Sequence, residues 1–244
     1  PIAMNIAFAT VLVPAIAGAL AVGNKKEASE KISYSFLISI LIIFPCAVGY
    51  IVMAQPIYKL LYPNAMLGSD LLQISSIALI FIALNQTISG SLQGIGKIFV
   101  PATGLLMGCI AKFILNVVLI RQPSINIYGA PISSIVCQVI SFSYGFTVLC
   151  KQTSVKLGFG KYIAKPLTAA IVMGACAVGV YKLAMYACHI NIISLFAAIA
   201  AAAVVYLLTV LKLNILSADE IEQLPAGGMI LKKLQGLGFY KDER

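Results

Sequence analysis

Charged residues are scarce in this chain. They make up 10% of its 244 residues, whereas hydrophobic residues make up 61% and the mean hydropathy is +1.00. Soluble domains carry about 25% charged residues, so the surface of this chain is not built to face water. The composition therefore excludes a soluble fold and indicates an integral membrane protein.

The residues of common catalytic and metal sites are also missing. His189 is the only histidine and lies near a predicted outer loop, so no Ser/His/Asp or Cys/His set can form. The six cysteines form no Cys-x-x-Cys pair and lie in or beside apolar runs, where they serve as apolar filler: Cys46, Cys109, Cys137, Cys150, Cys176 and Cys188. The chain has no P-loop motif and no selectivity-filter sequence. We predict no enzymatic activity, no metal site and no cofactor.

Acidic residues are few, which leaves a net charge of +9 from 17 Lys and Arg against 8 Asp and Glu. Such a balance can indicate nucleic-acid binding when the basic residues cluster on one element. Here they are scattered between apolar runs. This pattern fits the cytoplasmic loops of a membrane protein, and we predict no nucleic-acid partner.

Apolar runs long enough to cross a bilayer are abundant. A spanning helix needs about 20 predominantly apolar residues, and seven windows qualify: 2–22, 32–54, 71–94, 98–120, 127–150, 163–187 and 190–211. Short polar connectors separate them, and none is long enough to hold a soluble domain. The sequence predicts an all-α membrane protein with seven transmembrane helices.

The loop charges predict the orientation of these helices. Thirteen basic residues lie on one side: Lys25, Lys26, Lys31, Lys97, Lys151, Lys156, Lys161, Lys165, Lys212, Lys232, Lys233, Lys241 and Arg244. The other side has Lys59, Arg121 and Lys182. Because basic loops stay inside, we expect the first helix to enter from outside and the C-terminus to be cytoplasmic. The absence of an initial Met suggests a fragment, and a cytoplasmic native N-terminus would require an odd number of spans upstream.

The region after residue 211 differs in composition from the spans. Ser217 and Glu220 have the spacing of a capping box, which opens a short helix. Pro225 and Gly227-Gly228 end this helix, and a second stretch, 229–235, has apolar residues at helical spacing beside lysines. We expect an amphipathic tail on the cytoplasmic face of the membrane.

One lysine falls inside a predicted span. Lys112 lies past the middle of the 98–120 window, about 12 Å from its outer end, and a Lys can snorkel only part of that distance. Asn116 lies one turn further on the same face. All eight acidic residues lie in loops, at span ends or in the tail, so Lys112 has no evident carboxylate partner. Lys112 either faces a wet cavity and fixes the packing of the bundle, or contacts an anionic substrate.

The third span carries a stripe of polar residues. Asn85, Ser89 and Gln93 repeat at four-residue spacing and share one face, with Gln86 adjacent, and Asn5 adds an amide in the first span. Such residues either line an aqueous path or form hydrogen bonds between helices. Two Gly-x-x-x-Gly pairs, Gly90/Gly94 and Gly104/Gly108, predict close packing of neighbouring spans.

Proline interrupts two of the spans. Pro14 and Pro45 lie in mid-span, where each removes a helix hydrogen bond, so we predict a kink at each. Kinked helices suit transporters that alternate between inward and outward states, although receptors contain them as well.

Four motifs in order resemble one family. Residues 9–16 (ATVLVPAI) followed by 25–28 (KKEA) resemble the eighth span of the stage V sporulation protein B group, within the MOP superfamily of polysaccharide exporters and lipid II flippases. Residues 85–97 (NQTISGSLQGIGK) resemble its tenth span, 112–116 (KFILN) its eleventh, and 125–130 (INIYGA) the turn into its twelfth.

The resemblance implies spans eight to fourteen of a fourteen-span protein with two six-helix lobes around a central cavity. Residues 1–150 would then form helices of the C-terminal lobe, 151–211 two additional spans bordering a lipid groove, and 212–244 a cytoplasmic tail. The implied function is flipping of undecaprenyl-diphosphate-linked sugars across the bacterial inner membrane by alternating access. The implied partners are the bilayer, the lipid-linked sugar and the N-terminal half of the same protein.

Two other functions remain open from the sequence. A cation-coupled multidrug exporter of the same superfamily usually needs carboxylates inside the membrane, and these spans hold none. A seven-helix receptor shares the predicted topology, but the outer loops are short, the third span lacks an acidic-Arg-Tyr exit, and the last span lacks a Lys for a retinal linkage.

Overall fold

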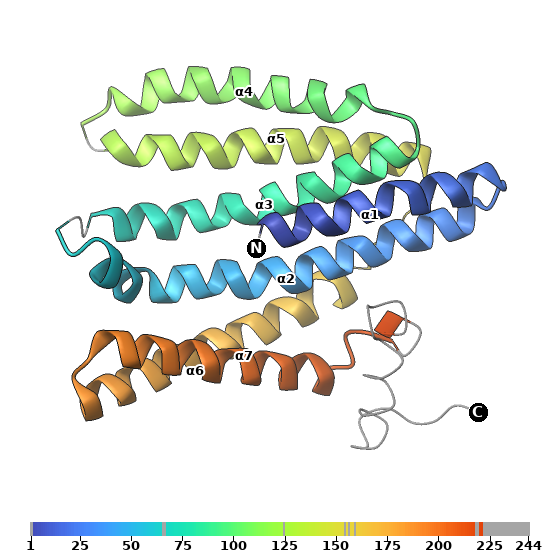
Figure 1. Cartoon of the computed structure of the whole chain (residues 1–244). Coiled ribbons are helices and arrows are strands. Elements are labelled where there is room, and N and C mark those ends of the chain that lie inside the picture. The colour runs from blue at the N-terminus through green and yellow to red at the C-terminus, as the bar shows by residue number, and fades with distance from the viewer. Residues whose placement is uncertain are drawn as a thin grey trace, which may run out of the picture.

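The computed structural model describes residues 2–64, 67–123, 125–153, 155, 157–158, 160–217 and 220–221. Its described part contains seven long α-helices and two short helical turns (Figure 1). The long helices are α1 (Ile2–Ala21), α2 (Lys25–Leu61), α3 (Gly68–Gly94), α4 (Phe99–Ile120), α5 (Gly129–Gln152), α6 (Lys165–Cys188) and α7 (Asn191–Lys212). The short turns are η1 (Asn126–Tyr128) and η2 (Gly160–Ala164).

All seven helices are long and apolar enough to cross a membrane, which confirms the predicted fold class. Large apolar side chains stay exposed on their outer faces, such as Phe113 (72% exposed) and Leu183 (74% exposed), where lipid contact costs nothing. Six helices end within about three residues of the predicted windows. α2 is longer than its window, because 37 residues extend for about 55 Å, well beyond a hydrocarbon core of about 30 Å.

The turn between α1 and α2 is sharp because glycine and asparagine close it. Gly23 has a φ of +73°, which favours glycine, and its N–H donates to the Leu20 carbonyl at 2.9 Å. Asn24 then caps α2 by accepting from the Glu27 N–H at 3.1 Å. A similar turn with Gly96 at φ +78° ends α3.

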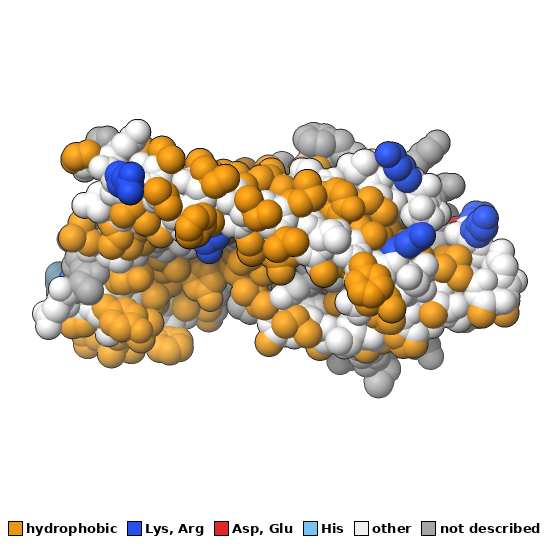
Figure 2. Space-filling view, turned by 90° about the horizontal axis from the view of Figure 1, so that it is seen from above, with side chains coloured by type: hydrophobic (Ala, Val, Ile, Leu, Met, Phe, Trp, Pro, Cys, Tyr) orange, Lys and Arg blue, Asp and Glu red, His pale blue; other side chains and the backbone are white. Residues whose placement is uncertain are grey.

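Successive helices run in opposite directions, so alternate connectors gather at the same end of the bundle (Figure 1). The end that holds the α1–α2, α3–α4 and α5–α6 connectors is called here the lysine-rich end. Its described basic residues are Lys25, Lys26, Lys31, Lys97, Lys151, Lys161, Lys165 and Lys212. Lys59, Arg121 and Lys182 lie at the opposite end. Figure 2 shows hydrophobic side chains over most of one face, with most visible Lys and Arg toward the ends.

α3 occupies the middle of the molecule and touches α1, α2, α4 and α5. A Cβ on Gly90 would lie 2.9 Å from the Ala9 carbonyl oxygen, and one on Gly94 would lie 2.9 Å from Ile16, so both glycines let α1 approach closely. α1 therefore runs along the lysine-rich half of α3 and begins beside its middle (Figure 1). Gly104 and Gly108 allow the same approach between α4 and α5, which confirms both predicted packing faces.

Three consecutive residues of α3 form hydrogen bonds to three different helices. Asn85 Nδ2 donates to the Gln138 carbonyl at 3.0 Å and to Gln138 Oε1 at 2.8 Å on α5. Gln86 Oε1 accepts from Asn5 Nδ2 on α1 at 3.0 Å. The hydroxyls of Thr87 and Ser39 share a hydrogen bond of 2.5 Å between α3 and α2. Because successive side chains leave a helix about 100° apart, these bonds hold α3 on three sides.

The helices continue through their internal prolines. Pro14 lies inside α1, and both Pro45 and Pro56 lie inside α2. Each proline withholds one backbone donor from its helix, and the kinks at Pro14 and Pro45 stay predictions.

The chain after α7 returns to the lysine-rich end of α2 and α6. Ile215 is fully buried beside Leu37, Leu41 and Ala169. Lys161 Nζ forms an ion pair of 2.7 Å with Glu220, whose Oε2 accepts from the Ser217 N–H at 2.8 Å, as the capping box predicts. Pro225, Gly227-Gly228 and the predicted amphipathic stretch 229–235 lie outside the described residues.

The ion pair also changes the acidity of Glu220. Burial raises the pKa of its carboxyl, but the hydrogen bonds from Lys161 and Ser217 and the charge of Lys161 outweigh burial and hold the pKa below its ordinary value of 4.5. Glu220 therefore stays ionised at neutral pH and keeps the segment after α7 attached to η2.

Candidate functional site

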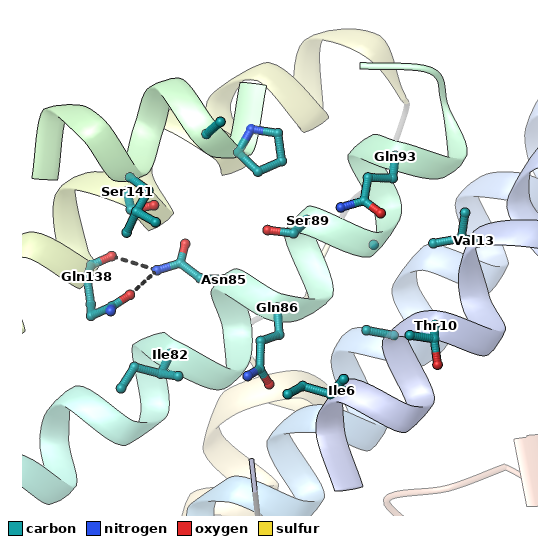
Figure 3. A pocket seen from close by; sticks show the side chains of 15 residues that line it. Ile6, Thr10, Val13, Ile82, Asn85, Gln86, Ser89, Gln93, Gln138 and Ser141 are labelled. Carbon is teal, nitrogen blue, oxygen red and sulfur yellow. Dashed lines mark hydrogen bonds between the residues drawn. The ribbon is translucent and has the colours of Figure 1, made fainter. Parts of the chain in front are cut away.

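A polar groove lies on α3 between α1 on one side and α4 and α5 on the other (Figure 3). Its volume is about 410 Å³. The lining residues define it: Ile6, Ala9, Thr10, Val13, Ile82, Asn85, Gln86, Ser89, Gly90, Gln93, Pro101, Ala102, Leu105, Gln138 and Ser141. The groove runs along α3 from its middle toward the lysine-rich end, and none of its lining side chains is charged.

Four of the six predicted cavity residues line this groove: Asn85, Gln86, Ser89 and Gln93. Figure 3 shows Asn85, Ser89 and Gln93 on the side of α3 that faces α4 and α5, and Gln86 turned toward Ile6 of α1. Asn85 and Gln86 both line the groove and form hydrogen bonds between helices, so the packing interpretation holds for them, while the aqueous path stays a prediction. Ser89 and Gln93 form no side-chain hydrogen bond with any residue that the structure describes.

Sequence reasoning missed three polar residues of the groove. Gln138 and Ser141 come from α5, and Thr10 comes from α1. Gln138 is an amide inside an apolar span, so the rule that singled out Asn85 applies to it equally. Asn5, which the sequence did single out, is 1% exposed and donates to the Ala83 carbonyl at 2.7 Å as well as to Gln86.

Lys112 and Asn116 lie outside the groove, on the seam between α4 and α5. They continue the four-residue spacing of Gly104 and Gly108, which face α5. Asn116 Oδ1 accepts from the Ser133 hydroxyl at 2.5 Å. Lys112 is half-buried, and it takes part in none of the ion pairs between described residues. It lies seven residues beyond Leu105, so about 10 Å along α4 separates it from the groove lining.

A second groove lies between α2, α6 and α7 and is called here the apolar groove. Its volume is about 440 Å³. Its lining consists of Pro45, Cys46, Gly49, Tyr50, Met53, Ile57, Met173, Ala177, Ile199, Ala202, Ala203, Tyr206 and Leu207. The Tyr206 hydroxyl donates to the Leu41 carbonyl at 2.7 Å, so this polar group is already satisfied. The groove thus offers an almost purely hydrocarbon surface beside the two last helices.

No group of three His, Cys, Asp or Glu side chains gathers within the described ranges in a way that could hold a metal ion. The described acidic residues lie at helix starts or beyond α7: Glu27, Glu30, Asp70 and Glu220. The polar groove therefore offers hydrogen-bond donors and acceptors without any acid or base.

Comparison with known proteins supports one family. A family model described as lipid II flippase MurJ matches residues 2–211. The chain is 28% identical over 154 residues to Lipid II flippase MurJ of Bacillus subtilis (strain 168), covering 61% of this chain and 28% of that protein. It is 32% identical over 131 residues to Uncharacterized membrane protein YabM of the same organism, covering 53% of this chain and 24% of that protein. The chain thus matches about a quarter of the length of each relative.

These matches confirm the expected MOP flippase relationship, while the narrower assignment to the stage V sporulation protein B group stays a prediction. The match over residues 2–211 includes both grooves and every span from α1 to α6, with α7 up to its penultimate residue. It agrees with the seven apolar helices of a multi-span membrane protein. The chain therefore belongs to the lipid II flippase MurJ family.

Proposed function

We propose that this chain is part of a flippase that moves an undecaprenyl-diphosphate-linked saccharide, a precursor of the cell wall, across the bacterial inner membrane. The observation that carries this proposal is the family match over residues 2–211, which includes a polar groove inside an otherwise apolar bundle. Polar surface inside a membrane is costly, and a substrate with a polar headgroup gives a reason to keep it.

The two grooves suit the two parts of such a substrate. The polar groove would face the headgroup during transport, and the apolar groove between α2, α6 and α7 would border the lipid tail. Residues 163–187 and 190–211 form most of α6 and α7, so the apolar groove supports the expectation that these spans border a lipid groove. Hydrocarbon packs against hydrocarbon without any need for polar partners.

Lys112 is the charged residue of this chain that we propose faces the anionic diphosphate of the substrate. It is half-buried on the α4–α5 seam, and no described carboxylate pairs with it. A desolvated ammonium group attracts phosphate more strongly than an exposed one does. We assign Lys112 to attraction of the diphosphate, with Asn116 beside it and bonded to Ser133.

Transport would proceed by alternating access. The lysine-rich end would face the cytoplasm, as the loop charges predict, and the chain after α7 would lie on that side. The N-terminal half of the same protein would supply the other wall of the cavity, consistent with the small part of each relative that this chain matches.

The alternatives have less support. A cation-coupled multidrug exporter usually binds its ion with carboxylates inside the membrane, whereas the acidic residues of the described spans lie at helix starts. The family match argues against a seven-helix receptor.

The proposal is tested in cells depleted of their own lipid II flippase. The full-length protein should restore growth, and the purified protein in vesicles should flip a lipid-linked disaccharide. Absence of both activities in an inserted, folded protein would contradict the proposed function.

Lys112→Ala should reduce flipping at least tenfold and leave insertion unchanged, because attraction of the diphosphate is lost. Lys112→Arg should keep most activity, since the charge remains. Lys182→Ala, which removes an exposed lysine of α6, is the matched control and should behave like the unmodified protein. Full activity of Lys112→Ala would remove Lys112 from the mechanism.

A further inference from the structure

The polar groove contains a ladder of three side chains along α3. Asn85, Ser89 and Gln93 occur at four-residue spacing, so they lie on one face and extend for about 12 Å. Figure 3 shows these side chains on the side of α3 that faces α4 and α5, near Gln138 and Ser141. Such a length suits a chain of two sugar rings better than one compact anion.

The three side chains of the ladder differ in whether they have a hydrogen-bond partner. Asn85, at its start, is bonded to Gln138 on α5. Ser89 and Gln93 have no side-chain hydrogen-bond partner among the residues that the structure describes, although both line the groove. Ser89 is half-buried, and Gln93 is exposed in the last turn of α3. Lipid hydrocarbon offers no hydrogen-bond partner to either side chain. Water or a ligand must therefore satisfy these two side chains.

The chemistry of the lining limits what that ligand is. All of the polar side chains are amides or hydroxyls, which both donate and accept hydrogen bonds. Phosphate is recognised by cations or by clusters of donors, and the lining has no Lys or Arg. Hydroxyl and N-acetyl groups of a saccharide are neutral and also both donate and accept. Apolar side chains such as Ile82 and Leu105 offer surface for the C–H faces of the rings.

From these observations we infer that the ladder of Asn85, Ser89 and Gln93, together with Gln138 and Ser141, binds the saccharide of the transported lipid through neutral hydrogen bonds, and that the diphosphate binds outside this groove. This inference rests on the proposed function and adds to it the part of the substrate that the groove recognises. Lys112, about 10 Å further along α4, lies outside the saccharide site.

The test measures binding of two lipids to the purified full-length protein. One is a short polyprenyl diphosphate that carries an N-acetylated disaccharide, and the other is the same diphosphate without sugar. The double variant Ser89→Ala/Gln93→Leu should bind the disaccharide lipid about tenfold more weakly, the effect of losing two neutral hydrogen bonds. Its affinity for the sugar-free lipid should not change.

Matched controls separate loss of the site from general damage. Ser143→Ala removes an exposed hydroxyl that bonds within α5, and Gln122→Leu removes an exposed amide after α4. The control double variant should bind both lipids like the unmodified protein. Gln93→Lys should weaken binding of the disaccharide lipid and leave the sugar-free lipid unaffected. Stronger binding of the sugar-free lipid to Gln93→Lys would locate the diphosphate in the groove and overturn the inference.

A labelling experiment gives a readout that does not depend on affinity. With the six native cysteines replaced, Gln93→Cys should react with a membrane-impermeant maleimide, and only the disaccharide lipid should protect it. Failure of the maleimide to react would mean that another helix fills the groove, and equal protection by both lipids would mean that the groove does not select the sugar. Either result overturns the inference. If the unmodified protein binds neither lipid, the proposed function itself fails.

Discussion

The polar groove and the apolar groove are nearly equal in volume and opposite in chemistry. The polar groove measures about 410 Å³ and the apolar groove about 440 Å³. In the polar groove, six side chains from α3 and α5 end in an amide or a hydroxyl, and Thr10 adds a hydroxyl from α1. In the apolar groove the Tyr206 hydroxyl bonds to the Leu41 carbonyl.

The difference shows that the polar groove contains more hydrogen-bonding side chains than the packing of its helices requires. α6 packs against α2 through small residues: a Cβ on Gly174 would lie 2.7 Å from Val48, and Ala170 is buried beside Ile43. The outer faces of α6 and α7 expose large apolar side chains that suit lipid. α3 instead presents polar groups to four neighbours, and some of these groups have no partner in the described chain. Polar groups inside a membrane are candidates for a functional site, which agrees with the role proposed for the polar groove.

The largest expected effect comes from placing a carboxylate in each groove. Ala203→Asp puts a charge in the middle of α7 within the apolar groove, and insertion should become about 2.5–3.5 kcal/mol less favourable. Gln138→Glu puts a carboxylate in the middle of α5, where Asn85 Nδ2 still donates to it. The loss in insertion free energy should therefore be distinctly smaller than for Ala203→Asp. The yield of folded, membrane-inserted protein measures both. Equal losses would show that the grooves do not differ in polarity as described.

The second comparison adds one methyl group beside each groove. Gly108→Ala places a Cβ against the Cys137 carbonyl oxygen, a backbone atom that cannot move aside easily. We expect a loss of about 1–3 kcal/mol in the free energy of unfolding. Gly49→Ala in the apolar groove meets nothing within 4 Å and should be tolerated. Thermal unfolding in detergent measures both, and a stable Gly108→Ala would mean that α4 and α5 are less closely packed.

A double-mutant cycle measures the polar pair that holds the wall of the polar groove. Asn85→Leu and Gln138→Leu, separately and together, should give a coupling free energy of about 0.6 kcal/mol, up to about 1.7 kcal/mol. Ser143→Ala, whose hydroxyl bonds within its own helix, combined with Asn85→Leu should show no coupling. Additive effects of Asn85→Leu and Gln138→Leu would mean that their hydrogen bonds add nothing to the association of α3 and α5.

The smallest expected effect is pH dependence at the lysine-rich end of α7. The pKa of Glu220 is lowered from 4.5 in the folded state, so its ion pair with Lys161 contributes fully above 4.5 and is lost as the pH falls through the lowered pKa. The loss should be about 0.2–1 kcal/mol. After correction for the intrinsic pH dependence of exchange, hydrogen-exchange protection at residues 213–217 should fall in acid, and Glu220→Gln should lower this protection at every pH. The polar groove, which has no titratable lining, should keep its protection.

Most of the fold could be predicted from the sequence, because a helix that crosses a bilayer needs a long apolar run and little else. α2 is the exception: its ends extend past the apolar window 32–54 through residues such as Lys25, Glu27 and Lys59. A hydropathy window detects the apolar centre of a helix and not its caps. Asn24 caps α2 by accepting from the Glu27 N–H, and this cap determines where α2 begins.

The site was less predictable, since a groove depends on which helices lie together. Spacing along one helix correctly grouped Asn85, Ser89 and Gln93. It could not show that Gln138 of α5 lies opposite them, or that Lys112 faces the α4–α5 seam. Gly104 and Gly108 show which face of α4 packs against α5, and Lys112 lies on that face.

The three bonds from Asn85, Gln86 and Thr87 have a mechanical consequence. A helix held on one side can roll about its axis, but α3 is held toward α5, α1 and α2 at a single level. Any roll would break all three bonds in the same movement, with no partner in lipid to replace them. Under the proposed alternating access, helices α1, α2, α3 and α5 should therefore move as one rigid body, with the hinge outside this group.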